Sequence, residues 1–153
     1  MKPIDQIIME KGNGDCMRAA VASILELPLV AVPHFMLNGN AAMYMSVFKA
    51  FMYAHGWKWK GNGCHNGILR WKPYHVDGHY IASVDSANFK DTYHAVVIDT
   101  EGNVVHDPSP KKQWQGKSLF ESENYHCFHL FAKRRDDEWK CLEESMRQAK
   151  EEK

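Results

Sequence analysis

Three residues of the types used in nucleophilic catalysis occur in the order Cys16, His94 and Asp107. Cys16 lies in "GNGDCMRAA", between a glycine-rich turn and an apolar run that favours a helix. The first turn of a helix leaves N–H groups unpaired and favours an anion, and the thiolate is the reactive form of cysteine. A nucleophilic cysteine also needs a base and a group that orients the base. His94 and Asp107, both in "YHAVVIDTEGNVVHDPSP", are the candidates for these two roles.

The segment that holds both candidates predicts a β-hairpin, and the hairpin register decides whether they meet. On the first strand, His94 and Val96 share a face because successive side chains alternate. If residues 101 and 102 form the central turn pair, Asp107 lies opposite Val96 and is the diagonal neighbour of His94 on that face. A three-residue loop would instead place His106 there. The triad therefore requires an even loop or a compensating bulge.

Helices are expected in the first third of the chain and at its end. The run "CMRAAVASILEL" is rich in alanine, with Asp15 placed to cap it and Pro28 to end it. The run "NAAMYMSVFKAFMYAHG" has Asn40 as its expected cap and Gly56 as its stop. A third helix is expected over residues 136–150, where apolar residues recur on one face.

After Gly56 the pattern changes to short runs rich in β-branched and aromatic residues. The expected strands are "WKWK", "HYIASVDS", "YHAVVIDT", "NVVHDPS" and "YHCFHLFAKR", with "GNGCHNG" as a loop. Helices followed by an antiparallel sheet predict an α+β fold. The 153 residues are expected to form one domain, with a helical part over about residues 1–56 and a sheet part over about 57–134.

The balance of charge argues against nucleic acid or membrane partners. Lys+Arg and Asp+Glu are equal at 19 each, so no net field attracts the chain to polyanions. No apolar run approaches a membrane span, and the N-terminal residues do not form the apolar core of a signal peptide. Four cysteines without a C-x-x-C pair are expected to be free thiols of a cytoplasmic protein. The sequence leaves the oligomeric state open.

Nine histidines also raise the question of a metal site. His75 and His79 are four residues apart, and further His and Cys residues stand at Cys64–His65 and in "HCFH". Zinc sites typically use tighter pairs, such as C-x2-C with H-x3-H. We therefore expect no metal and no other cofactor.

The quoted segments together resemble the papain-like cysteine peptidase superfamily. "GDCMRAAVASILELPLVAVPHF" and "HYIASVDS…YHAVVIDTEGNVVHDPSP" are most similar to the bacteriocin-processing branch and to small uncharacterised bacterial and phage proteins. The resemblance covers about residues 6 to 110. It rests on the Cys, His and Asp order and on the "DP" after the second strand. It implies a papain-like fold, in which N-terminal helices pack on a C-terminal antiparallel sheet.

The resemblance also implies roles for individual residues. Cys16 would be the nucleophile, His94 the base, and Asp107 the group that holds the imidazole tautomer. The Cys16 N–H and a glutamine amide would bind the oxyanion. In the family this glutamine lies shortly before the cysteine, whereas Gln6 lies ten residues before Cys16. Asn13 is the alternative donor.

The function expected on these grounds is that of a cysteine hydrolase. It would cleave an amide, peptide or isopeptide bond of a peptide or protein substrate through a thioester, with Trp71 and Tyr74 as candidate substrate-binding residues. The same triad also suits an acyltransferase, and peptidoglycan-cleaving relatives share the Cys-then-His order. An inert binding or inhibitor protein on the same scaffold is the alternative from a different class.

Overall fold

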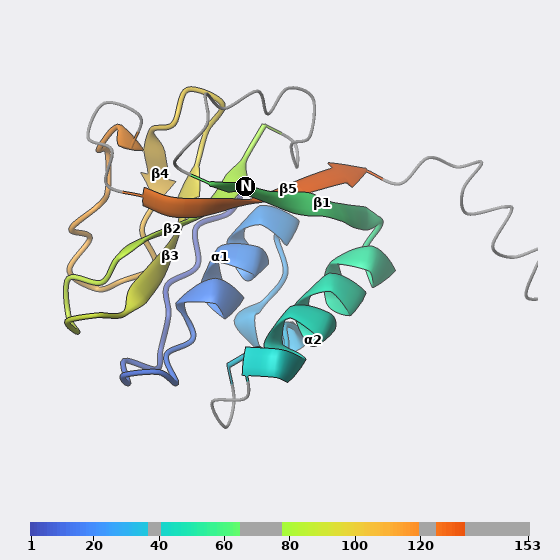
Figure 1. Ribbon diagram of the computed structural model, residues 1–153, viewed down its shortest axis with the longest axis horizontal. Coiled ribbons are helices and arrows are strands. Elements are labelled where there is room, and N and C mark those ends of the chain that lie inside the picture. The colour runs from blue at the N-terminus through green and yellow to red at the C-terminus, as the bar shows by residue number, and fades with distance from the viewer. Residues whose placement is uncertain (37–40, 65–77, 120–124, 134–153) are drawn as a thin grey trace, which may run out of the picture.

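The computed structural model describes residues 1–36, 41–64, 78–119 and 125–133 (Figure 1). The helices are α1 (Cys16–Leu25) and α2 (Ala41–Ala54), with a short 3-10 helix, η1 (Leu29–Ala31), between them. The strands are β1 (Trp57–Cys64), β2 (Tyr80–Asp85), β3 (Tyr93–Ile98), β4 (Val104–His106) and β5 (Tyr125–Lys133). These helices precede the strands, which confirms the mixed α+β class. The helix expected over residues 136–150 lies outside the described residues.

The five strands form one antiparallel sheet in the order β1-β5-β2-β3-β4. The last strand in sequence therefore lies between the first two. Both helices cover the same face of the sheet, with α1 against β2 and β3 and α2 against β1 (Figure 1). This arrangement sets the N-terminal end of α1 beside β3, the strand that carries His94.

Apolar side chains cover both faces of the sheet. On the helix side, Ile81, Ala95 and Val97 pack with the buried residues of α1 and α2. On the opposite side, the cluster consists of Tyr80, Ala82, Val84, Val96, Ile98, Val104, Trp114 and Leu119. Burial on both faces explains why β3 reads as a nearly continuous apolar run.

The first strand is longer than predicted. The sequence indicates a strand over "WKWK" followed by a loop, but β1 continues to Cys64 and pairs with β5 along its length. An irregularity between Trp59 and Gly61 leaves one residue unpaired, and the ladder resumes beyond it. For residues 61–64 the loop prediction was wrong, because long-range pairing with β5 outweighs the weak strand propensity of glycine. The rest of that predicted loop, residues 65–67, lies outside the described residues.

Asp15 does not cap α1 with its side chain, contrary to the sequence prediction. It occupies the position before the helix, but its carboxylate makes no capping hydrogen bond. Instead, its Oδ1 accepts hydrogen bonds from the backbone N–H groups of Ile7 at 3.1 Å and Ile8 at 2.8 Å. A buried carboxylate needs donors, and here the preceding chain segment supplies them.

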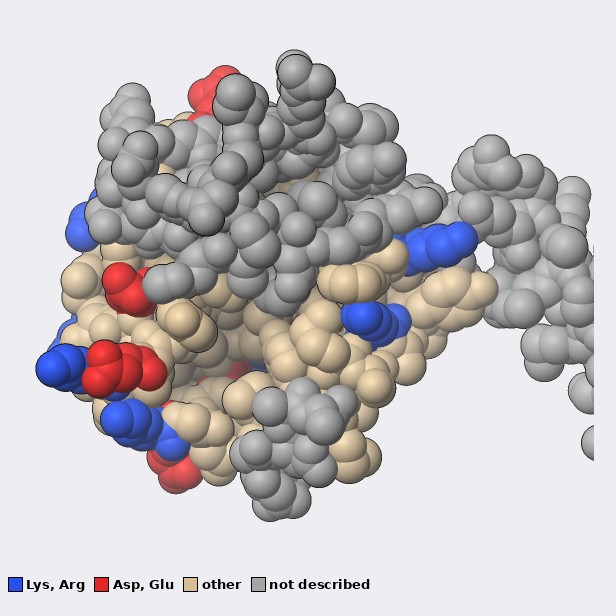
Figure 2. All heavy atoms as spheres, in the orientation of Figure 1, with Lys and Arg blue, Asp and Glu red and all other residues tan. Residues whose placement is uncertain are grey.

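The described residues also show how charge is distributed and how apolar the helices are. Figure 2 shows acidic and basic side chains of the described residues interspersed on the face in view, as the equal totals of 19 suggest. Within the described part of the chain, no helix has both the length and the apolar character needed to cross a bilayer.

Candidate active site

The β3–β4 hairpin brings His94 and Asp107 together by the second of the two routes that the sequence left open. Three residues form the loop between Asp99 and Asn103, whose backbone groups pair at 3.0 Å, and Gly102 takes a positive φ of 82°. That odd loop alone would turn Asp107 away from His94. However, the register shifts between Ile98, opposite Val104, and Val97, opposite His106. Val105 is therefore the extra residue of a bulge, and the bulge restores the predicted position of Asp107.

His94 and Asp107 are in direct contact. His94 Nε2 lies 2.7 Å from Asp107 Oδ1, and Asp107 is fully buried. The backbone N–H of Ser109 donates to Oδ1 at 2.9 Å and that of Trp114 donates to Oδ2 at 2.9 Å. These bonds hold the carboxylate in one orientation, and the carboxylate in turn fixes the imidazole.

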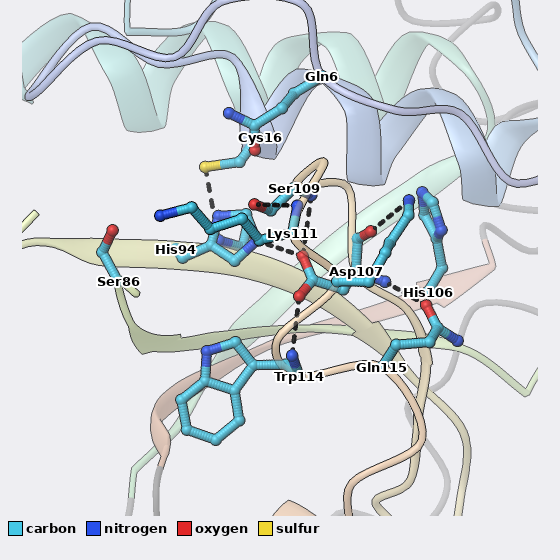
Figure 3. Close-up of polar contacts among 12 residues, drawn as sticks. Gln6, Cys16, Ser86, His94, His106, Asp107, Ser109, Lys111, Trp114 and Gln115 are labelled. Atoms are coloured by element: carbon cyan, nitrogen blue, oxygen red, sulfur yellow. Dashed lines mark hydrogen bonds and ion pairs between the residues drawn. The ribbon is translucent and has the colours of Figure 1, made fainter. Parts of the chain in front are cut away.

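Cys16 lies on the other side of the imidazole from Asp107 (Figure 3). It is the first residue of α1 and is half-buried. The backbone N–H of Ala95 approaches Cys16 Sγ at 3.5 Å, which links the thiol to β3. The nearby Cys16 thiol is one of the groups that raise the pKa of the His94 ring. Because Nε2 faces Asp107, Nδ1 is the ring nitrogen left for the thiol.

The surroundings of His94 favour its charged form. Burial lowers the pKa of His94, but hydrogen bonds with Asp107 and Cys16 outweigh burial and raise this pKa from 6.5 to about 9. The imidazole is therefore protonated at neutral pH, and both ring nitrogens are donors. Burial also acts on Asp107 by raising its pKa, but the bonds from His94, Trp114 and Ser109 lower it overall. A protonated histidine thus stands between a carboxylate and a thiol.

The N-terminal segment folds back so that Gln6 and Cys16, ten residues apart in sequence, line the same site. The backbone N–H of Gln6 donates to the carbonyl of Pro108 at 3.0 Å, so this segment runs beside the residues that follow β4. Its return toward α1 is fixed by Asp15, whose N–H donates to the carbonyl of Ile8 at 3.3 Å. Residues 9–14 form the loop between these contacts. The ten-residue separation therefore does not prevent Gln6 from reaching the site.

The side chain of Gln6 is buried, with 8% of its surface exposed, and lines the same cavity as Cys16 and His94 (Figure 3). Its Nε2 donates to the carbonyl of Ile8 at 3.0 Å and faces Met9 Sδ at 2.7 Å. A thioether is a weak acceptor, so the N–H directed at Met9 can turn to a stronger one. Asn13, the alternative donor, bonds Glu10 in the loop and is not among the cavity residues.

The cavity beside Cys16 has a volume of about 490 Å³, a size typical of small-molecule sites. Its described lining is largely apolar and includes several methionines from the N-terminal half of the chain. Polar side chains of Ser86, Asn88 and Thr92 lie on the part of the wall formed by the β2–β3 connection. The reacting groups thus open onto a defined space.

The remaining sequence candidates fall into two groups. Trp71 and Tyr74 lie outside the described residues, as does His75. His79 is described, but across residues 1–36, 41–64, 78–119 and 125–133 no group of three or more His, Cys, Asp or Glu side chains is arranged to hold a metal ion.

The sequence did not predict that Asp15 and His106 support the site. Asp15 holds the N-terminal segment, and His106 Nε2 donates to the carbonyl of Ile4 at 2.8 Å, two residues before Gln6. Burial lowers the pKa of His106, although its bond to Ile4 opposes this effect. His106 ends β4, directly before Asp107, but its partner Ile4 lies 102 residues away, so no local pattern showed this role.

The fold and the site together define an α+β protein in which a cysteine, a protonated histidine and a buried aspartate are in contact. Comparisons of the chain with family models, with curated proteins and with solved structures found no match. The chemistry of the chain is therefore best inferred from these residues themselves.

Proposed function

We propose that the protein is a cysteine hydrolase that cleaves an amide or peptide bond through a thioester on Cys16. The proposal is carried by one observation: His94 bonds Asp107 through Nε2, and the Cys16 thiol lies beside the same residue of β3, where it accepts the N–H of Ala95. A base that is oriented by a buried carboxylate and touches a thiol is the arrangement that activates a nucleophile. The helix-first order, with the cysteine beginning α1, supports a papain-like fold as part of the proposal.

In the first half of the reaction, the thiolate of Cys16 attacks the carbonyl carbon of the substrate, and the carbonyl electron pair moves to oxygen. The resulting oxyanion is stabilised by donors near the sulfur. When the intermediate collapses, the bond to nitrogen breaks and His94 gives its proton to the leaving amine. The products of this half are a thioester on Cys16 and a free amine.

In the second half, neutral His94 removes a proton from water as the water oxygen attacks the thioester carbon. Collapse of that intermediate breaks the carbon–sulfur bond and releases the carboxylic acid. The thiolate returns beside a protonated His94. Asp107 keeps the ring in the orientation that both proton transfers require, because two backbone N–H groups hold the carboxylate in place.

Gln6 is the side-chain donor proposed for the oxyanion. Its amide lines the cavity with Cys16, and the N–H that faces Met9 has only a thioether as its partner. An oxyanion is a far stronger acceptor and would take that N–H in the transition state. The backbone N–H of Cys16, in the first turn of α1, is the second donor proposed. We place the reaction in the cytoplasm, where a nucleophilic thiol stays reduced.

The test is the alkylation rate of Cys16 by iodoacetamide at pH 6, measured by peptide mapping so that the other cysteines are scored separately. A thiol with the ordinary pKa of about 8.5 is less than about 1% ionised at this pH. We expect Cys16 of the wild type to react at least about tenfold faster than Cys16 of His94→Ala, because the charged imidazole stabilises the thiolate.

His55→Ala is the matched control, since His55 is exposed just after α2 and is bonded to the carbonyl of Phe51. This variant should keep the wild-type rate. Equal rates in the wild type and His94→Ala would contradict the proposed activation.

A further inference from the structure

The cavity beside Cys16 has two chemically different walls. The helix side is contributed by the N-terminal half of the chain and carries four methionines, Met9, Met17, Met36 and Met45. Ser86, Asn88 and Thr92 come from the β2–β3 connection and give the sheet side more polar groups, although Phe89 and Tyr93 also line it. His94, at the start of β3, belongs to the sheet side. The methionines make the first side mainly apolar, apart from Gln6 and Glu10, and the sheet side carries more hydroxyl and amide groups, so the cavity suits an amphipathic ligand.

The direction in which such a ligand lies follows from the proposed chemistry, on which this inference rests. The leaving amine must receive its proton from His94, so it departs on the side of Ser86, Asn88 and Thr92. The acyl group stays on Cys16 and must occupy the remaining space, against the methionines.

The methionine wall favours a particular shape of acyl group. Methionine is unbranched and flexible, so a wall of four methionines adapts to a slender chain better than to one rigid ring. Met17 is 7% exposed, and Met9, Met36 and Met45 are half-buried, so the wall is packed and not a loose surface. Among the cavity residues that the structure describes, the one carboxylate is Glu10 and none is Lys or Arg. An acidic acyl group would therefore find no Lys or Arg here, and the one charged imidazole, that of His94, faces the leaving amine.

We propose that the substrate is an amide between an unbranched apolar acyl chain and a polar amine, with the chain lying along Met9, Met17, Met36 and Met45. The cavity volume of about 490 Å³ holds a chain of several methylenes together with the reacting amide. The chain belongs either to a fatty acyl group or to a linear apolar side chain of a peptide.

The test uses straight-chain acyl amides of 2, 4, 6, 8 and 10 carbons on a fluorogenic aminocoumarin that bears a polar carboxamide. Each buried methylene is expected to raise kcat/KM about fourfold until the cavity is full, because methylene burial contributes roughly 0.8 kcal/mol. Acetyl-norleucine and acetyl-serine amides of the same amine form the peptide arm. A gain for norleucine beyond that of the equally long acyl chain assigns the chain to a peptide, and the reverse assigns it to a fatty acyl group.

Met45→Gln and Met43→Gln are the matched variants. Both residues are on α2, but Met45 lines the cavity whereas Met43 is 60% exposed and does not. Met45→Gln should flatten the dependence on chain length, and Met43→Gln should leave it unchanged. The inference is overturned if kcat/KM of the wild type does not change with chain length, or if the acetyl-serine amide is cleaved faster than the acetyl-norleucine amide. Either result leaves the hydrolase proposal intact.

Calorimetry with Cys16→Ala separates the two proposals. This variant keeps the methionine wall and should bind the 10-carbon amide much more tightly than the 2-carbon amide. If it does so although the wild type cleaves neither, the cavity assignment stands and the hydrolase proposal fails. Equal and weak binding of both amides would overturn the cavity assignment.

Discussion

Two buried carboxylates, one in the N-terminal segment and one after the β3–β4 hairpin, accept the same kind of hydrogen bonds but differ in what they act on. Asp15 is 1% exposed and Asp107 is fully buried. Each accepts hydrogen bonds from two backbone N–H groups, those of Ile7 and Ile8 for Asp15 and those of Ser109 and Trp114 for Asp107. For Asp107, burial raises the pKa, but the bonds from His94 and these two N–H groups lower it overall.

The difference between the two lies in the third contact. Asp107 bonds the ring of His94 at 2.7 Å, so its charge acts on a titratable group beside the thiol. The nearest cation to Asp15 is Arg18 at 3.9 Å, and Oδ2 of Asp15 is buried without a hydrogen-bond partner among the described residues. Asp107 is therefore positioned to affect the chemistry directly, whereas Asp15 can affect it only through the segment that carries Gln6.

Asp107→Asn should have the largest effect. An amide replaces one oxygen acceptor by an NH₂ donor, so either the N–H of Trp114 or the ring of His94 loses its acceptor. We expect kcat/KM to fall about 1,000-fold because the imidazole loses its fixed orientation and its charge partner. The pKa of His94, followed by NMR titration, should fall toward its ordinary value. Urea unfolding should show a loss of about 1–3 kcal/mol.

Asp99→Asn is the control for this experiment. Asp99 Oδ1 also accepts two backbone N–H bonds, from Glu101 and Asn103, at the other end of the same hairpin. Its replacement should cost stability without moving the pKa of His94. The assignment of Asp107 is wrong if both variants change the pKa of His94 alike, or if Asp107→Asn keeps the wild-type rate.

The next effect concerns Gln6 and Asp15, tested as a double-mutant cycle. Gln6→Ala removes an oxyanion donor and should lower kcat by about 100-fold. Asp15→Asn loosens the segment that holds Gln6. A misplacement of 1 Å costs about 100-fold, so a smaller displacement of Gln6 should lower kcat by about tenfold. In the Gln6→Ala background, Asp15→Asn should have almost no further effect on kcat.

Rescue by a conservative change distinguishes positioning from simple destabilisation. Asp15→Glu keeps the carboxylate and should recover part of the kcat lost in Asp15→Asn. A general loss of stability would instead lower the unfolding midpoint of both Asp15→Asn and Asp15→Glu. If Asp15→Asn lowers kcat equally with and without Gln6, the two residues act independently and the positioning role of Asp15 is refuted.

The local features of the site could be predicted from the sequence because they depend on neighbouring residues. The alanine-rich run predicts the helix that Cys16 begins, and alternation predicts the strand of His94. The predicted meeting of His94 and Asp107 is confirmed by their contact at 2.7 Å. The catalytic roles of these residues stay predictions.

The features that could not be predicted depend on contacts between distant segments. The bulge at Val105 is seen only in the register of β4 against β3, whereas the sequence required either an even loop or a compensating bulge and did not choose between them. The insertion of β5 between β1 and β2 is a non-local pairing with no local signal. Asp15 has the type and place of a helix cap, and only the approach of Ile7 and Ile8 shows its different role.

The last expected effect acts on stability and is a pair of opposite pH dependences, which extends the comparison to the histidines of the hairpin. The pKa of His94 is raised to about 9, so its contribution to stability is fully present below pH 6.5 and is lost as the pH rises through about 9. The pKa of His106 is lowered, so its contribution is present above pH 6.5 and is lost as the pH falls below that value. One such proton changes the free energy of unfolding by at most about 1.4 kcal/mol per pH unit.

Urea unfolding between pH 5 and pH 10 tests both signs, with each histidine as the control for the other. His94→Gln should remove the alkaline loss and keep the acid loss, and His106→Gln should do the reverse. The basic limb of kcat/KM should follow His94 alone, with a midpoint near pH 9 in the wild type and in His106→Gln. If stability is still lost at alkaline pH in His94→Gln, the group that loses its proton there is not His94, and His94 is not the group whose protonation links the hairpin to Cys16.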